Sequence, residues 1–124
     1  MKKRKLIELN HQLSRELFDK GFRTPDTYVS AFFEPLPKSS GIYVFLKTDI
    51  DKFSESFGAQ SILYVGQSIN IFNRINRHEI ARQIEDFFQV WFLSVNKNVL
   101  TETEKKYIYK YDPPWNIIHR RRGV

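Results

Sequence analysis

Apolar residues recur along the chain with two different periods, and each period predicts one kind of element. Near the N-terminus the period is three to four residues, which is typical of an amphipathic helix. The apolar stripe of this helix consists of Leu6, Leu9, Leu13 and Leu17. Gly21 follows the last turn of the pattern and marks the expected end of the helix. The prolines within residues 22–40 then favour a connector with little regular structure.

Three later segments are short and rich in β-branched and aromatic residues. They predict strands at residues 41–47, 61–66 and 88–95. The third segment is apolar on both faces, so it is expected either in the centre of a sheet or beneath helices. Between the first two strands, residues 48–60 form a polar insert that is expected to contain a helical turn around residues 51–57.

Two further helices complete the predicted order of helix, strand, strand, helix, strand, helix. Asn70 is a good N-cap for a helix over residues 71–85. Thr101 begins another helix, which Pro113 and Pro114 end after about residue 111. The chain has 124 residues, which is the size of one domain with one modest core.

An antiparallel pairing of the first two strands would bring two tyrosines together. The register that sets Tyr43 opposite Tyr64 and Phe45 opposite Ile62 gives every apolar residue an apolar neighbour. The opposite face would then hold Ile42, Val44, Leu63 and Val65. Two phenols side by side are compatible with a functional site, but on these two residues alone a purely stabilising cross-strand pair is the favoured interpretation.

The helix after the second strand carries polar residues on the side that meets the sheet. Ile71 and Ile75 set its apolar direction; Arg74 lies about 60° and His78 about 20° from Ile71, whereas Arg77 points outward. Two interpretations stay open for both inward residues. Arg74 either snorkels from the edge of the packed face or serves a site, and His78 is either a hydrogen-bonded core histidine or a second site residue.

Glu104 lies on an inward helix face too, four and seven residues before Ile108 and Tyr111. The local sequence offers a second explanation for this glutamate. Thr101 and Glu104 have the spacing of a capping box, in which the glutamate returns a hydrogen bond to the N-cap backbone. Metal binding and helix capping are therefore both compatible with this position, while Glu102 points elsewhere and is the weaker ligand candidate.

Charge and composition favour a polyanionic partner. The formal net charge is +6, with basic clusters at residues 2–5 and 120–122, and each phosphate that a protein neutralises releases condensed counterions. The absence of cysteine excludes a disulfide framework and a cysteine zinc site. Apolar runs are too short to span a membrane, and the basic start lacks the apolar core of a secretory signal, so a cytoplasmic location is expected.

Two phenols, a guanidinium, an imidazole and a carboxylate on one face would suit phosphodiester hydrolysis. A carboxylate is a hard oxygen ligand of the kind that Mg²⁺ prefers, with water and phosphate in the remaining positions. Arginine binds phosphate bidentately and stabilises developing negative charge. Hydrolysis needs these groups together with a nucleophilic water and a proton acceptor.

These residues resemble the signature of the GIY-YIG nucleases. Gly41-Ile42-Tyr43 and Tyr64-Val65-Gly66 are similar to its two half-motifs, with valine in place of the central isoleucine of the second. Arg74 stands eight residues after Gly66, where the family carries its helix arginine, and His78 follows one turn later, as in the homing and restriction branches. 

The resemblance covers residues 39–118 and includes the end of the chain's last helix. The segment from Glu104 to Asn116 is similar to the family's closing segment of metal-binding glutamate, apolar helix, proline and asparagine. Two features depart from the family pattern. The insert at residues 48–60 is longer than the family minimum, and Gln67 stands where some repair nucleases have lysine, which argues against the repair branch.

For the fold, the resemblance implies an α+β domain in which a central three-stranded antiparallel sheet is flanked by helices. The chain adds an N-terminal helix to this plan. The expected organisation is an N-terminal helical extension at residues 1–38, a nuclease domain at 39–118 and a basic C-terminal tail at 119–124.

For the activity, the resemblance implies a metal-dependent DNA endonuclease that uses one-metal, tyrosine-assisted in-line attack of water. One Mg²⁺ or Mn²⁺ per site would be held by Glu104. Tyr43 would act as general base or water positioner, and Tyr64 would hydrogen-bond the phosphate or the water. Arg74 would stabilise the transition state, and His78 would assist the proton relay or orient Tyr43. 

Other residues are expected to support this site. Structural roles beside it are implied for Gly41, Gly66 and Asn116, and the expected nucleic-acid contacts are Lys47, Gln67, Arg77, Arg120, Arg121 and Arg122. DNA is the expected partner, with a homodimer or a targeting protein left open; neither a membrane nor a small-molecule cofactor is expected. The alternatives to an active nuclease are an inactive nucleic-acid-binding module on the same fold and, last, a structural or protein-interaction domain.

Overall fold

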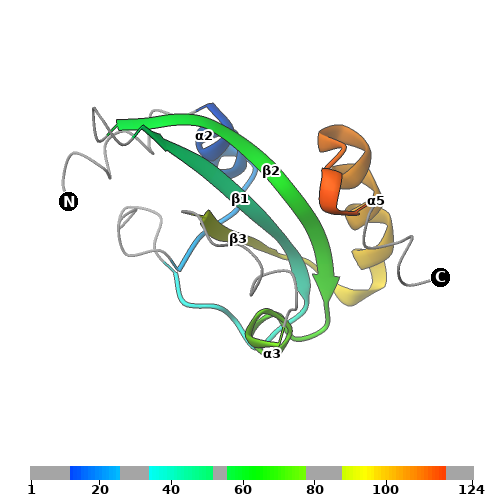
Figure 1. Cartoon of the computed structure of the whole chain (residues 1–124). Coiled ribbons are helices and arrows are strands. Elements are labelled where there is room, and N and C mark those ends of the chain that lie inside the picture. The colour runs from blue at the N-terminus through cyan, green and yellow to red at the C-terminus, as the bar shows by residue number, and fades with distance from the viewer. Residues whose placement is uncertain (1–11, 26–33, 52–55, 78–87, 117–124) are drawn as a thin grey trace.

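Strands and helices follow one another in the predicted order throughout the part of the chain that is described. The computed structural model describes residues 12–25, 34–51, 56–77 and 88–116 (Figure 1). Its elements are α2 (Gln12–Asp19), β1 (Gly41–Asp51), β2 (Ser56–Ser68), α3 (Ile71–Asn76), β3 (Phe88–Ser94), the 3₁₀ helix η2 (Lys97–Val99) and α5 (Leu100–Tyr111). Leu6, Leu9 and residues 78–85 of the predicted helices lie outside the described residues.

The three strands form one antiparallel sheet in the order β2-β1-β3. The expectation of a small α+β fold with a three-stranded antiparallel sheet and flanking helices is therefore confirmed. Of the two positions expected for the segment at residues 88–95, the structure shows the one beneath helices: β1 is the middle strand, β3 lies at an edge, and Trp91 of β3 is buried in one core with residues of α2 and α5. The chain before β1 covers part of that edge: Arg23 and Phe92 exchange two backbone hydrogen bonds of 2.8 Å each. This cover, together with helices on the face, accounts for the apolar character of β3.

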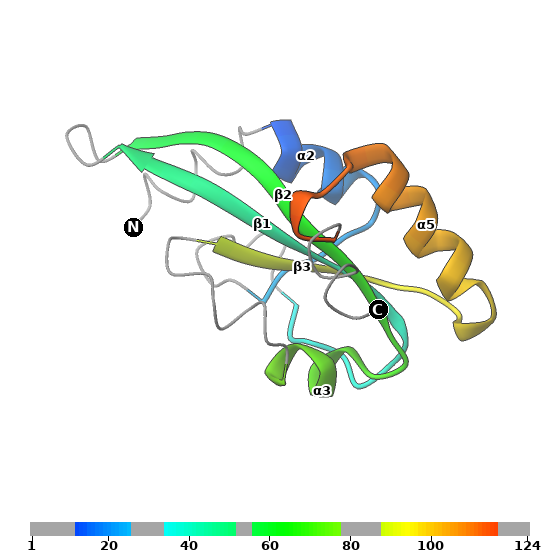
Figure 2. The same ribbon diagram turned by 45° about the vertical axis from the view of Figure 1, so that its right-hand side comes forward.

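The first two strands are much longer than the sequence predicts. β1 continues to Asp51 and β2 begins at Ser56, with Ile50 paired to Phe57. The predicted helical turn around residues 51–57 is wrong at both of its ends; residues 52–55 lie outside the described ranges. β3 pairs only with residues 41–47 of β1, so the added part of the hairpin is a two-stranded ribbon that projects from the sheet (Figure 2). The residues of the insert show no regular apolar alternation, so the sequence pattern did not predict this part of the two strands.

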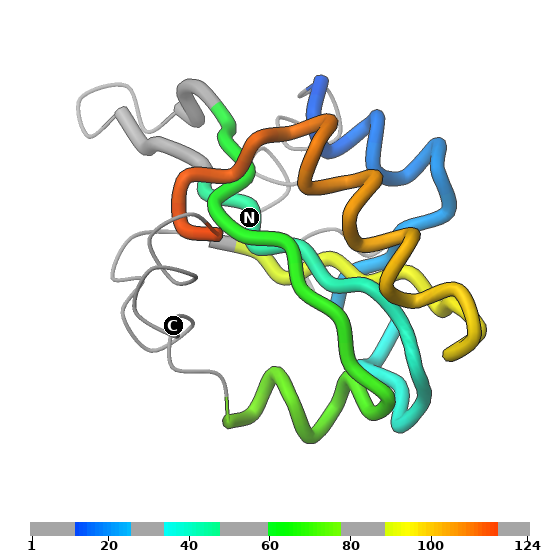
Figure 3. Tube along the Cα trace, turned by 90° about the vertical axis from the view of Figure 1, so that its right-hand side faces the viewer, coloured from blue at the N-terminus to red at the C-terminus, as the bar shows by residue number. Residues whose placement is uncertain are grey.

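Helices α2 and α5 cover one face of the sheet, and α3 lies on the other (Figures 1 and 3). The larger core lies between the sheet and the first pair. It contains Leu17, Phe22, Ile42, Val44, Leu46, Ile62, Val65, Trp91, Leu100 and Tyr107. Gly21 ends α2 as predicted, with a φ of 99° that favours glycine. Because Leu17 and Phe22 are fully buried, the N-terminal helix shares its core with the sheet.

The opposite face carries the aromatic cluster, which consists of Tyr43, Phe45, Leu63 and Tyr64. Ile75 of α3 and Trp115 pack against it. These apolar contacts exclude water around the two phenols. The sequence predicts the chemistry on this same face. None of the described helices has both the length and the apolar character that crossing a membrane requires.

Candidate active site

The two tyrosines of the half-motifs lie on the same face but are not directly opposite each other. Tyr43 pairs with Gly66, and Phe45 pairs with Tyr64. The predicted register, with Tyr43 opposite Tyr64, is therefore wrong by two residues. The two rings are diagonal neighbours, with centroids 6.1 Å apart and planes inclined by 35°. A shift of two residues keeps a side chain on its face, so the phenols still meet.

A β-bulge explains why the apolar pattern pointed to the wrong register. The pairing shifts between Phe45 and Leu46, and Leu46 faces Ile62 rather than Leu63. Leu63 is the extra residue of the bulge and joins Tyr64 in the aromatic cluster, while Ile62 joins the larger core. One inserted residue reverses the alternation beyond it. The predicted placement of Leu63 with Val65 is wrong for that reason.

The glycines of the two half-motifs are required by close contacts. A Cβ atom at Gly66 would overlap the ring of Tyr43, which crosses directly over this glycine. At Gly41 a Cβ atom would overlap the carbonyl oxygen of Leu93 and the side chain of Ile71. Both glycines are therefore structural residues of the site: Gly66 makes room for the first phenol, and Gly41 brings α3 close to the sheet.

Arg74 reaches the tyrosines from α3. The helix begins at its predicted N-cap, where the Asn70 side chain accepts a 3.1 Å hydrogen bond from the Asn73 backbone. Ile71 is fully buried and turns the helix so that the Arg74 side chain extends over the aromatic cluster. The Arg74 Nε donates to the Tyr43 hydroxyl at 3.2 Å, while Arg77 is exposed at the end of the helix.

His78, the second predicted polar residue of this helix, lies outside the described residues. The same holds for Arg120, Arg121 and Arg122. Their predicted roles in proton relay and nucleic-acid binding therefore stay predictions. Lys47, another expected nucleic-acid contact, is half-buried in β1 and pairs with Ser61 of β2 and Phe88 of β3.

Both phenols are held in their neutral form. Burial raises the pKa of Tyr43 far above its usual value of about 10; Tyr64 and Glu104 add to the rise and Arg74 opposes it. Burial likewise raises the pKa of Tyr64, and Glu104 adds to this rise. Loss of water around the phenolate outweighs the attraction of the guanidinium. Arg74 thus does not bring the pKa of Tyr43 below its usual value, as a general base at neutral pH would require.

Glu104 lies at the edge of the sheet on α5. Its charge acts on both tyrosines, as the rise in the pKa of Tyr43 and Tyr64 indicates. It also accepts a 3.4 Å hydrogen bond from the Gln67 Nε2 of β2. Of the two explanations left open for Glu104, the capping box is wrong. The N-cap of α5 is Val99, two residues before Thr101, and its side chain makes no cap hydrogen bond, so Thr101 lies inside the first turn.

Asn116 ties the segment after α5 to the outer edge of β2. Its Oδ1 accepts from the Val65 backbone nitrogen at 2.9 Å, and its Nδ2 donates to the Val65 carbonyl oxygen at 2.8 Å. A single amide thus satisfies both backbone groups of an edge-strand residue, as a further strand would. Asn116 is 5% exposed, and Val65 is fully buried. Asn116 therefore fixes the segment after α5 to β2.

A divalent cation would find one carboxylate here rather than a preformed cage. Within residues 12–25, 34–51, 56–77 and 88–116, no three histidine, cysteine or acidic side chains cluster as metal ligands. Glu104 nevertheless has the donor chemistry that Mg²⁺ accepts, since this ion is commonly held by one or two carboxylates with water and substrate phosphates in the other positions. Glu104 fits a metal that binds together with the substrate.

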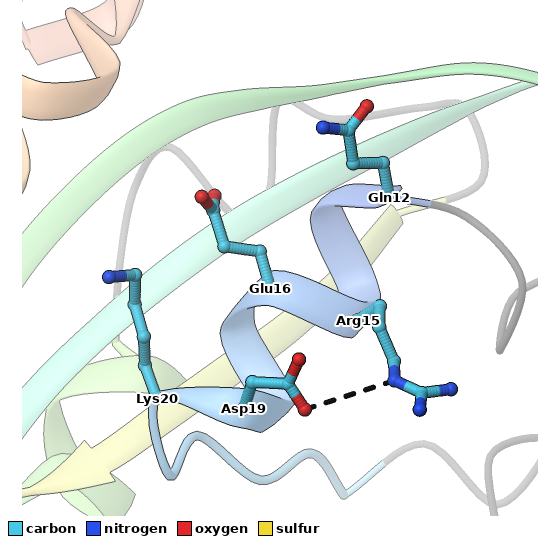
Figure 4. A pocket seen from close by; sticks show the side chains of 5 residues that line it. All are labelled: Gln12, Arg15, Glu16, Asp19 and Lys20. Carbon is cyan, nitrogen blue, oxygen red and sulfur yellow. Dashed lines mark ion pairs between the residues drawn. The ribbon is translucent and has the colours of Figure 1, made fainter.

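A surface depression lies away from this site. It is formed by α2 and the residue that follows it, with Gln12, Arg15, Glu16, Asp19 and Lys20 around it (Figure 4). Arg15 and Asp19 are exposed and form a 3.8 Å ion pair across one turn. Charged side chains of a single solvated helix do not form a binding site for a small molecule, so this depression adds no candidate chemistry.

Comparisons of the chain with protein-family models, with curated proteins and with solved structures found no match. The interpretation of the site therefore depends on its own geometry. One contact of the site was not expected from the sequence: Gln67 was expected to contact nucleic acid, but its side chain lies beside Glu104. The available signal was its place directly after Gly66, at the end of the second half-motif.

Proposed function

We propose that this chain is a divalent-metal-dependent endonuclease of the GIY-YIG type that hydrolyses phosphodiester bonds in DNA. One observation carries the proposal. Arg74 donates to the Tyr43 hydroxyl at 3.2 Å, beside Tyr64 and within the electrostatic reach of Glu104. Residues from two strands and two helices thus meet at one end of the sheet. The contact between Gln67 of β2 and Glu104 of α5 joins positions that are 37 residues apart in the sequence.

In the proposed reaction a water oxygen attacks the phosphorus in line with the bond to the leaving oxygen. The bond from phosphorus to the water oxygen forms while the bond to the leaving oxygen breaks. The attacking water gives up one proton to the solvent, and the leaving oxygen takes up one proton from the solvent. Arg74 binds the non-bridging oxygens and stabilises the negative charge that develops on them. A guanidinium stays cationic at any physiological pH, so this role needs no change of protonation state.

Tyr43 and Tyr64 act in this proposal as hydrogen-bond donors that orient the water and the phosphate. Their raised pKa values keep both phenols protonated at neutral pH. A neutral phenol donates a hydrogen bond well but accepts a proton poorly. Of the two roles that the resemblance implies for Tyr43, positioning the water is therefore favoured over general-base catalysis.

Glu104 would hold the cation. When bound, Mg²⁺ or Mn²⁺ would make the attacking water more acidic and would offset the charge of the phosphate. The contribution of the protein is then to orient the carboxylate and to keep the phenols and Arg74 around the substrate. The net charge of +6 supports DNA as the substrate, since it favours association with a polyanion.

A cleavage assay with Glu104→Gln tests the proposal. Supercoiled plasmid and branched or single-stranded oligonucleotides would be incubated with Mg²⁺, Mn²⁺ or EDTA. Metal-dependent cleavage by the parent protein is expected to disappear in Glu104→Gln while DNA binding remains. Glu102→Gln is the matched control, because it removes one exposed carboxylate from the same helix and should leave turnover unchanged.

Two results would overturn the proposal. Full turnover in Glu104→Gln would show that this glutamate has no role in the reaction. DNA binding without cleavage by the parent protein under every metal condition would instead favour a nucleic-acid-binding module on the same fold.

A further inference from the structure

The position directly after the second half-motif carries an uncharged donor that faces the metal-binding candidate. Gln67 is partly buried in β2, where it pairs with Ile42 of the central strand. Its Nε2 donates a hydrogen bond of 3.4 Å to the Glu104 Oε1. The two residues are joined only by tertiary structure, since 37 positions separate them in the sequence.

The geometry points to Gln67 as a positioning residue that orients the Glu104 carboxylate for a divalent cation. This inference rests on the proposed function, because it assumes that Glu104 is the ligand. A glutamate on a helix surface rotates about several bonds, and holding it in one rotamer has an entropic cost. A hydrogen bond from a side chain on a strand restricts the carboxylate to one orientation before the cation binds. Hydrogen-bond partners of metal ligands commonly have this role.

The chemical nature of the donor matters as much as its place. An amide is neutral, so it restrains the carboxylate without cancelling the negative charge that attracts the cation. A lysine at the same position would donate as well, but its ammonium would compete with the cation for the carboxylate and repel it. Gln67 therefore combines orientation with an undiminished charge on Glu104.

Direct binding of Mn²⁺ tests this inference without relying on cleavage. Free Mn²⁺ would be measured by electron paramagnetic resonance with the full chain and a short uncleavable DNA duplex. The variants are Gln67→Leu, which keeps the bulk and removes the donor, and Gln67→Lys, which keeps a donor and adds charge. Glu104→Gln defines loss of the ligand, and Gln12→Ala is a control amide on the exposed side of α2.

The expected result is Mn²⁺ binding that is about 10-fold weaker in Gln67→Leu, in line with the loss of an outer partner of a metal ligand. Gln67→Lys should bind more weakly still, and Gln12→Ala should match the parent protein. Thermal unfolding checks that each variant is folded. If Gln67→Leu is unstable, Gln67→Lys carries the test, because it retains a long polar side chain at the site.

Two results would overturn the inference, and they differ in what they leave standing. If Gln67→Leu and Gln67→Lys bind Mn²⁺ as tightly as the parent protein while Glu104→Gln does not, Glu104 is a ligand that needs no help from Gln67. If the parent protein binds Mn²⁺ no better than Glu104→Gln does, Glu104 is not a ligand, and the metal site of the proposed function falls together with the inference.

Discussion

Asn116→Ala should destabilise the protein by more than any surface substitution, because one amide closes the outer edge of β2. The substitution removes hydrogen bonds of 2.9 and 2.8 Å to the backbone of Val65. Each bond contributes about 1 kcal/mol net, and leaving a buried donor or acceptor unpaired costs about 1–3 kcal/mol. Val65 is fully buried, so the expected loss in the free energy of unfolding is about 2–4 kcal/mol.

Urea unfolding followed by circular dichroism would measure this loss. The midpoint should fall while the slope with denaturant stays the same, since the surface exposed on unfolding is nearly unchanged. The melting temperature should fall by roughly 10 °C. Asn73→Ala is the matched control: this asparagine is exposed on α3, and its truncation should change stability by less than about 0.5 kcal/mol.

A loss below about 1 kcal/mol in Asn116→Ala would refute the reasoning, because it would mean that water or a rearranged backbone replaces the amide at Val65. Cleavage offers a second check. A residue that only supports the strand should lower turnover by no more than the fraction of protein that is unfolded. Loss of turnover in a fully folded Asn116→Ala protein would place the residue in the reaction itself.

The remaining predictions concern the aromatic face and the charge of the chain. Gly66→Ala should impair folding, as measured by thermal unfolding, because the new Cβ would overlap the ring of Tyr43; a variant with unchanged stability would contradict this contact. Arg74→Ala should lower turnover by about 10²–10³-fold and Arg77→Ala far less; equal losses would contradict the assignment of Arg74 to the site. Above pH 10 the unfolded chain binds fewer protons than the native state, because burial raises the pKa of Tyr43. Stability should therefore fall with rising pH there, by up to about 1.4 kcal/mol per pH unit for each such tyrosine, and less steeply in Tyr43→Phe; identical urea-unfolding profiles for the two proteins would refute it. DNA affinity should decrease with salt by a slope of about 0.9 per phosphate contacted, and a flat response would remove basic residues from the interface.

The sequence was most informative where one residue type has one local meaning. Asn70 caps α3, Gly21 ends α2, and the half-motif glycines lie where no larger residue fits. The cap and the helix end are decided by backbone geometry within a few residues, so the sequence alone reveals them. The two glycines contact distant residues, and it was the family resemblance that singled them out. Helical periodicity also identified Arg74 as the side chain that turns toward the sheet.

Long-range pairing was less accessible, because it depends on contacts that no local pattern contains. The alternation of apolar residues is compatible with more than one register. The sequence pattern does not reveal the bulge at Leu63, and without the bulge the wrong register gives every apolar residue an apolar neighbour. Similarly, the capping-box pattern at Thr101 and Glu104 did not reveal that η2 leads directly into α5 and places the N-cap two residues earlier, at Val99. Local signals compete at such positions, and packing decides between them.

The sequence by itself determined the order of the elements, the end of α2, the start of α3 and the types of side chain that the site would contain. Only the tertiary structure decided that β1 is the central strand, that Tyr43 and Tyr64 meet diagonally, and that Gln67 contacts Glu104. It also decided the protonation state of the phenols. A tyrosine in sequence has an ordinary pKa, and burial against the aromatic cluster raises it, because desolvation depends on neighbours that are distant along the chain.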